Sequence, residues 1–236
     1  MEFIQTQKFN NHNIATVFHD AGSKNLVIFC HGYRGSSIGP NRFFVRLARD
    51  LADKGISSLR FDQYGCGNSE GDFKDSSFND WLETTRSIIR HYQERDFRIA
   101  LLGQSMGGAA VIAVGSELDL VAVVAWAPDP NIEEFIAPES GIIEEGGQIV
   151  QVKYWQEAHD ARVADRFPKI KAPTYIIFAS EDEMVSRDNQ EAIISRAQPH
   201  QKVEVLEGHK HSAWTYNQAT NVINKTAEFI IGAFSV

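Results

Sequence analysis

Short runs of consecutive apolar residues alternate along the chain with segments whose apolar residues recur at helical spacing. The runs are unbroken rather than alternating, which is typical of strands buried on both faces. They predict strands at residues 26–30, 56–61, 99–102, 120–127, 174–179 and 202–206. The intervening segments predict helices at residues 43–54, 78–95, 107–116, 187–197 and 218–233. This order predicts a parallel sheet with helices on both faces, and two weaker strand patterns in residues 1–20 predict an antiparallel edge hairpin.

One stretch, residues 128–168, breaks this rhythm. It has few strand-like runs, and between Asp129 and Glu145 it carries six acidic residues and no basic one. An irregular segment of this length inside a compact domain is typical of a functional insertion or lid, with a solvated surface excursion as the alternative. We therefore predict a core domain formed by residues 1–127 and 169–236, with a cap inserted at residues 128–168.

Composition indicates a globular protein and excludes several classes. Apolar residues make up 43% of the chain and charged residues 23%, as in ordinary globular domains. The net charge of -8 leaves no basic footprint for binding nucleic acid or an anionic membrane. No apolar run approaches the roughly 20 residues of a membrane span, and no signal peptide is visible. Cys30 and Cys66 are expected to be free thiols in a reducing compartment, so we expect a cytoplasmic protein.

The strongest chemical signal is Gly-Gln-Ser-Met-Gly at residues 103–107, a G-x-S-x-G motif. It follows a predicted strand and opens a predicted helix, which is the context of a nucleophile elbow. The glycines remove Cβ atoms that would collide in so tight a turn, and the turn holds the Ser105 hydroxyl out over the carboxyl ends of the strands. The helix directs backbone N–H groups toward developing negative charge. Ser105 is therefore the candidate nucleophile.

With this motif, the chain resembles the α/β-hydrolase family of serine hydrolases, in particular its small feruloyl (cinnamoyl) esterases and monoacylglycerol-lipase-like members. Four further segments are similar to the family's oxyanion loop (His-Gly), its Asp-x-x-Gly-x-Gly-x-Ser loop, its acid segment (Asp-x-x-Val) and its Gly-x-x-His motif. They are residues 31–33, 62–69, 182–185 and 208–211. The resemblance implies an α/β-hydrolase fold, with a mostly parallel central sheet, helices on both faces and a short cap insertion.

The same resemblance implies a catalytic triad of Ser105, Asp182 and His211. Ser105 would attack an acyl carbonyl, while His211 would take the proton and pass it to the leaving group. Asp182 would fix the imidazole tautomer. The backbone N–H groups of Tyr33 and Met106 would form the oxyanion hole. This chemistry requires no metal and no organic cofactor, and the expected partner is a small-molecule acyl ester.

Two of these assignments have close rivals. His209 lies two residues before His211, and the two could form half of a metal site, although no third ligand is evident. Glu181 and Glu183 flank Asp182, and only one of the three carboxylates can face the imidazole. The family spacing favours His211 and Asp182.

Other residues are expected near the substrate. His31 and Gln104 adjoin the oxyanion loop and the nucleophile, and Gln104 stands where many relatives have His, so the resemblance leaves specificity open. Trp126 and Trp155 could line an aromatic acyl pocket, but core packing fits them equally well. His31 is also expected to shape its loop, and Asp62 to bond to local backbone groups.

The leading interpretation is a carboxylic ester hydrolase that acts on a small or medium acyl ester. A serine peptidase or amidase, or a thioesterase or lactonase, would use the same triad, because one fold hosts many chemistries. A non-hydrolytic binding protein on this fold would be expected to lack one of the three triad residues. The acidic cap disfavours strongly anionic substrates such as acyl-CoA.

Overall fold

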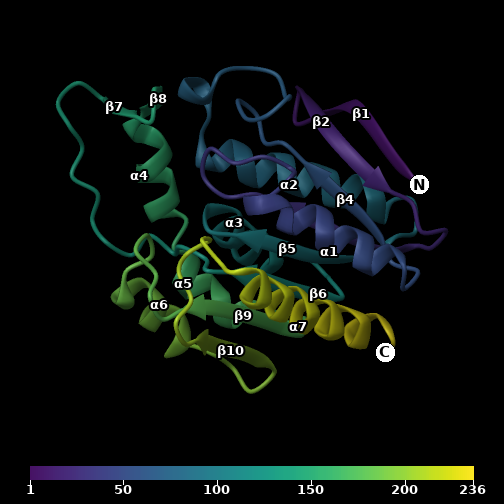
Figure 1. The fold of residues 1–236 in the computed structure, drawn as a ribbon. Helices are drawn as coiled ribbons and strands as arrows, with labels where there is room; N and C mark the ends of the chain where they lie inside the picture. Colours follow the sequence, from purple (N-terminus) through teal and green to yellow (C-terminus); the bar gives the residue numbers. More distant parts are fainter.

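The computed structural model describes residues 1–236 and contains an eight-stranded sheet in the order β1-β2-β4-β3-β5-β6-β9-β10 (Figure 1). Its strands are β1 (Glu2–Phe9), β2 (His12–His19), β3 (Asn25–Cys30), β4 (Ser57–Phe61), β5 (Arg98–Gln104), β6 (Ala122–Trp126), β9 (Thr174–Ala179) and β10 (Gln201–Leu206). The strands from β4 to β10 pair in parallel, and β1 and β2 form an antiparallel hairpin at one edge. The predicted parallel sheet and edge hairpin are both confirmed.

Helices cover both faces of this sheet. They are α1 (Phe43–Ala52), α2 (Phe78–Gln93), α3 (Met106–Gly115), α4 (Val152–Asp160), α5 (Val163–Arg166), α6 (Arg187–Ile194) and α7 (Tyr216–Phe234), with short 3₁₀ turns η1 (Pro40–Arg42), η2 (Phe73–Asp75) and η3 (Phe167–Lys169). Helix α1 packs beside α7 and α2 beside α3. The two pairs contribute to two separate apolar clusters, one on each face.

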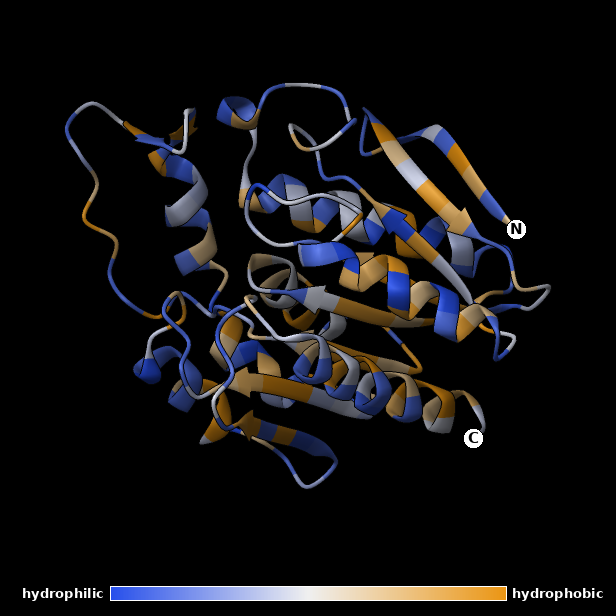
Figure 2. Cartoon of the chain, viewed as in Figure 1, coloured by the Kyte–Doolittle hydropathy of each residue, from blue (hydrophilic) through white to orange (hydrophobic).

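The core is divided by the alternation of side chains along the central strand β3. Leu26, Ile28 and Cys30 pack in the cluster that contains α2 and α3. Val27 and Phe29 pack in the cluster that contains α1 and α7. All five side chains are fully buried, so each face of the strand needs apolar residues and the run is unbroken. In Figure 2 the central strands are largely orange, while the helices that cover them carry blue as well as orange residues.

The segment between β6 and β9 leaves the sheet at the carboxyl ends of the strands (Figure 1). It forms an antiparallel hairpin of β7 (Ile142–Glu145) and β8 (Gln148–Gln151), followed by α4 and α5, which the sequence pattern did not predict. These elements depend on tertiary contacts: α4 packs on α2 and β8 on η2. The Arg34 guanidinium also donates to the carbonyl and the carboxylate of Glu145 at the hairpin tip, at 2.5 and 3.1 Å. The cap limits of 128–168 stay a prediction.

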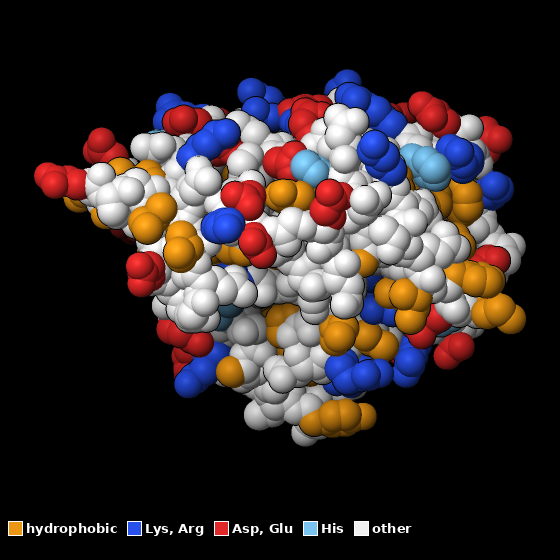
Figure 3. All heavy atoms as spheres, turned by 90° about the horizontal axis from the view of Figure 1, so that it is seen from above, with side chains coloured by type: hydrophobic (Ala, Val, Ile, Leu, Met, Phe, Trp, Pro, Cys, Tyr) orange, Lys and Arg blue, Asp and Glu red, His pale blue; other side chains and the backbone are white.

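The surface carries charges of both signs. On the face shown in Figure 3, Lys and Arg side chains are interspersed with Asp and Glu side chains, and no continuous basic patch is visible. None of the helices combines the length and the apolar character that crossing a bilayer requires. Both cysteines are buried free thiols, and the sequence predicts that they form no disulfide.

Candidate active site

Ser105 alone forms the turn between β5 and α3. Its backbone has φ 55° and ψ −123°, a conformation that is strained for a residue with a side chain. A Cβ added to Gly103 would lie 2.1 Å from the carbonyl oxygen of Gly107, and a Cβ added to Gly107 would lie 2.2 Å from that of Cys30. Only glycine fits at both positions, so the motif is required by the close approach of β3, β5 and α3.

Asp182 and His211 form a hydrogen-bonded pair in the loops that follow β9 and β10. Nδ1 of His211 lies 2.9 Å from Oδ2 of Asp182, and Oδ1 accepts the N–H groups of Met184 and Val185 at 2.9 and 2.8 Å. Burial raises the pKa of Asp182, but these hydrogen bonds outweigh burial and bring the pKa below its ordinary value. The carboxylate therefore stays ionised and accepts the Nδ1 proton, which leaves Nε2 as the basic nitrogen of His211.

The rival residues have other partners. Glu183 accepts the backbone N–H of His211 at 3.4 Å, and the backbone N–H of Glu181 donates to the carbonyl of His209 at 2.8 Å. His209 uses Nδ1 on a backbone carbonyl at 2.9 Å, while its Nε2 is buried without a partner. No group of three or more His, Cys, Asp or Glu side chains is placed to hold a metal ion. Among the alternatives, the structure brings together Asp182 and His211.

The N–H groups proposed for the oxyanion hole have no acceptor in the protein backbone. Met106 is the first residue of α3, where an intrahelical acceptor is lacking, and Tyr33 lies in the loop after β3. His31 fixes this loop: its Nε2 accepts the N–H of Gln63 at 2.9 Å, and its Nδ1 donates to the carbonyl of Gly32 at 2.8 Å. Burial lowers the pKa of His31, which keeps the ring neutral in this bridge. Through these two hydrogen bonds, His31 joins the loop after β3 to the loop after β4.

Asp62 fixes the loop that follows β4. Its two carboxylate oxygens accept the N–H groups of Ser37 and Asn68 at 2.6 and 2.8 Å. A Cβ on Gly67 would come within 2.2 Å of this carboxylate. These contacts confirm that Asp62 bonds to local backbone groups.

A cavity of about 670 Å³ brings the candidate residues together. Its lining includes His31, Tyr33, Gln104, Ser105 and His211. Ser105 Oγ makes no hydrogen bond within the protein, and Nε2 of His211 instead lies 3.3 Å from Nε2 of Gln104. Ser105 and His211 thus line one cavity, and the side chain of Gln104 contacts His211 there.

Comparison with known proteins identifies the family of the chain. The family model for serine aminopeptidase, S33, matches residues 21–139, which is half of the chain. The protein belongs to this family. The matched range contains residues 31–33 and Ser105, whereas Asp182 and His211 lie beyond it.

Individual relatives of this S33 family member differ in how much of the chain they match. YfhR of Escherichia coli O157:H7 is 22% identical over 187 residues, which are 78% of this chain and 64% of YfhR. Proline iminopeptidase of Saccharolobus solfataricus is 36% identical over 94 residues, which are 39% of this chain and 29% of that enzyme. The chain thus spans less than two thirds of the length of these curated relatives.

A solved structure matches the S33 family member over nearly its whole length. Est1E from Butyrivibrio proteoclasticus, in a structure with ferulic acid bound, superposes with a TM-score of 0.86 at 22% identity, over 98% of this chain and 100% of Est1E. Together with the family match, this likeness confirms the predicted α/β-hydrolase fold.

Two tryptophans predicted as pocket residues lie away from the Ser105 cavity. Trp126 is fully buried in the cluster that contains α1 and α7, and its Nε1 donates to Thr226 at 2.9 Å. Because its side chain leaves β6 on that face, Trp126 is a core residue rather than a pocket residue. Trp155 lies against Tyr33, with ring centroids 4.9 Å apart. It lines a separate cavity of about 300 Å³ beside Asp129.

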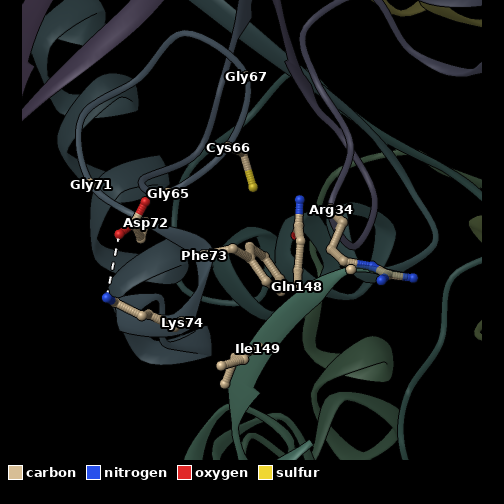
Figure 4. Close-up of a pocket in the computed structure, with 11 residues that line it drawn as sticks. Arg34, Gly65, Cys66, Gly67, Gly71, Asp72, Phe73, Lys74, Gln148 and Ile149 are labelled. Carbon is tan, nitrogen blue, oxygen red and sulfur yellow. Dashed lines mark ion pairs between the residues drawn. The ribbon is translucent and has the colours of Figure 1, made fainter. Parts of the chain in front are cut away.

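A further cavity of about 490 Å³ adjoins the one that holds Ser105, because Arg34 and Gly67 line both. It lies between the loop after β4 and the tip of the β7–β8 hairpin, and the side chains of Cys66 and Gln148 point into it (Figure 4). Burial raises the pKa of Cys66 to about 12, so its thiol stays protonated at neutral pH.

Asp129, three residues after the end of β6, allows a test of the electrostatics of this family member. Burial raises its pKa to about 6, although the N–H of Asn131 and the charge of His211 oppose the rise. A carboxyl group whose pKa is higher in the folded than in the unfolded state destabilises the protein once pH exceeds its pKa in the unfolded state. The loss of folding stability is complete above its pKa in the folded state. Asp129→Asn should therefore stabilise the protein by on the order of 1–2 kcal/mol at about pH 8 and much less near pH 4.

Thermal unfolding at the two pH values measures this difference. Asp20→Asn is a matched control, because exposed Asp20 accepts the N–H of the residue two positions later, as Asp129 does. An equal effect of Asp129→Asn at both pH values would contradict the expected ionisation penalty.

Proposed function

We propose that the chain hydrolyses small or medium carboxylic esters through an acyl-enzyme intermediate on Ser105. The observation that carries the proposal is the Asp182–His211 hydrogen bond of 2.9 Å, with His211 and Ser105 lining the same cavity. A serine hydroxyl is a weak nucleophile and needs an adjacent base, which must itself be held by a third group. His211 supplies the base, and the ionised Asp182 supplies the group that holds it.

In the proposed reaction, Ser105 Oγ attacks the acyl carbonyl while Nε2 of His211 takes the hydroxyl proton. The carbonyl oxygen becomes an oxyanion, which accepts the N–H groups of Tyr33 and Met106. Collapse of this intermediate breaks the ester bond, and His211 returns the proton to the departing alkoxide. A water molecule then attacks the acyl-enzyme with His211 again as the base, which releases the carboxylic acid and restores Ser105.

An aminopeptidase activity is the second candidate, and the S33 family match and the iminopeptidase relative favour it. The iminopeptidase alignment, however, reaches only 29% of that enzyme. The likeness to Est1E covers 98% of this chain and 100% of that chain. The extent of these matches supports an esterase over an iminopeptidase.

Hydrolysis of p-nitrophenyl esters from acetate to palmitate, with a cinnamoyl ester and proline p-nitroanilide alongside, tests the proposal. We expect turnover to be highest for short or medium acyl chains and absent for the anilide. A fluorophosphonate should block turnover and label Ser105, as mass spectrometry of the peptide would show. Faster cleavage of the anilide than of any ester would instead establish the aminopeptidase. No turnover and no labelling would overturn the hydrolase proposal.

A further inference from the structure

The imidazole of His211 already has a partner in the resting protein, and that partner is not the nucleophile. Nε2 of Gln104 lies 3.3 Å from Nε2 of His211, while Ser105 Oγ makes no hydrogen bond. Both partners are enclosed, with Gln104 6% exposed and His211 8% exposed. The residue immediately before the nucleophile therefore occupies the nitrogen on which the nucleophile depends.

The hydrogen bond between Asp182 and Nδ1 of His211 determines which group donates at Nε2. Asp182 is ionised and accepts the Nδ1 proton of His211, so the neutral imidazole presents only a lone pair at Nε2. The amide of Gln104 must turn an N–H toward it. Its Oε1 then lies beside Gly32, where an added Cβ would come within 2.7 Å of that oxygen. Gly32 thus leaves room for the orientation in which Gln104 donates.

We propose that Gln104 is a positioning residue that holds His211 in the resting enzyme and competes with Ser105 for the lone pair on Nε2. The ring has one lone pair at this atom, so it cannot fully accept from both donors. Attack by Ser105 therefore requires Gln104 to release the imidazole. This inference rests on the proposed roles of Ser105, Asp182 and His211.

The expected effect is modest, because a hydrogen bond between neutral groups contributes little net free energy. We expect the competition to slow acylation by about 2- to 10-fold. Gln104→Met keeps the length of the side chain and removes the donor, so fluorophosphonate should label Ser105 faster by this factor. For an ester whose acylation is rate-limiting, kcat should rise while KM stays the same. Gln104→Asn, whose amide is shorter by one methylene group, should also accelerate labelling.

Gln104→Glu separates competition from packing. It keeps the shape of Gln104 but presents a carboxylate, which favours the protonated imidazole. Labelling should be slower at neutral pH, and the onset of activity should move to higher pH. Asp182, Glu183 and Asp129 act on His211 in every variant, as do its chain neighbours Lys210 and His209. The comparison between variants therefore isolates position 104.

Gln201→Met is the matched control. Gln201 is also 6% exposed, but its amide donates to the carbonyls of Phe167 and Ile170 at the start of β10. This variant should label at the wild-type rate. If Gln104→Met and Gln104→Asn, both folded, label no faster than wild type, the competition is refuted while labelling of the wild type preserves the hydrolase proposal. A wild-type protein that is not labelled at all would overturn both.

Discussion

Replacement of Ser105 by alanine is expected to reduce kcat for ester hydrolysis by about 10⁴- to 10⁶-fold, because it removes the only group that can form the acyl-enzyme. The fold should survive. Ser105 Oγ has no hydrogen-bond partner in the structure, so its loss leaves no buried group unpaired. Alanine meets the same strain as serine at φ 55°. Turnover of p-nitrophenyl butyrate and the thermal unfolding midpoint measure the two quantities separately.

Ser116→Ala is the matched control for this variant, since Ser116 caps the other end of α3 and its hydroxyl donates to Ala113. It should lose no activity, whereas a small loss of stability is expected from the missing hydrogen bond. Substantial turnover by Ser105→Ala, with the phosphonate still blocking it, would place the nucleophile elsewhere.

The fold could be predicted from the sequence because local pattern and burial agree in the central strands. Residues 26–30 of β3 and 99–102 of β5 are all apolar and buried, so these unbroken runs mark the two strands directly. The hairpin β7–β8 was missed for the opposite reason. Its residues are mostly exposed, and it is held by its packing on η2 and by the contact of Arg34 with Glu145. Contacts between residues this far apart in sequence leave no periodic signal.

The candidate site shows the same limit. Ser105 follows from its motif, and the family spacing selects the acid and the histidine that the structure places 2.9 Å apart. Trp126 could not be assigned, because alternation along a strand does not tell which face meets a pocket and which meets a helix. The contact of Gln104 with His211 was also hidden, since it joins the end of β5 to a loop more than a hundred residues later. The position of Gln104 next to the nucleophile was the one available signal.

His211→Ala is expected to lower kcat by about 10⁴-fold or more, whereas His209→Ala should lower it less than about tenfold. The two histidines are a matched pair, because both are 8% exposed and they lie in the same loop. Only His211 reaches the carboxylate of Asp182 and lines the cavity with Ser105. His209 instead holds its loop through Nδ1 and packs near Trp214, with ring centroids 6.4 Å apart.

Parallel measurement of kcat and thermal unfolding distinguishes these roles. We expect His209→Ala to act mainly through stability, because it removes a loop hydrogen bond and leaves a void beside Trp214. His211→Ala removes the partner of the buried Asp182 carboxylate and should also lose stability, but its loss of activity should exceed that of His209→Ala by about a thousandfold. Deacylation needs the same base as acylation, so both steps should slow in His211→Ala. The reverse order of the two activities would move the base to His209, and Asp182 would then hold an imidazole that is not the base.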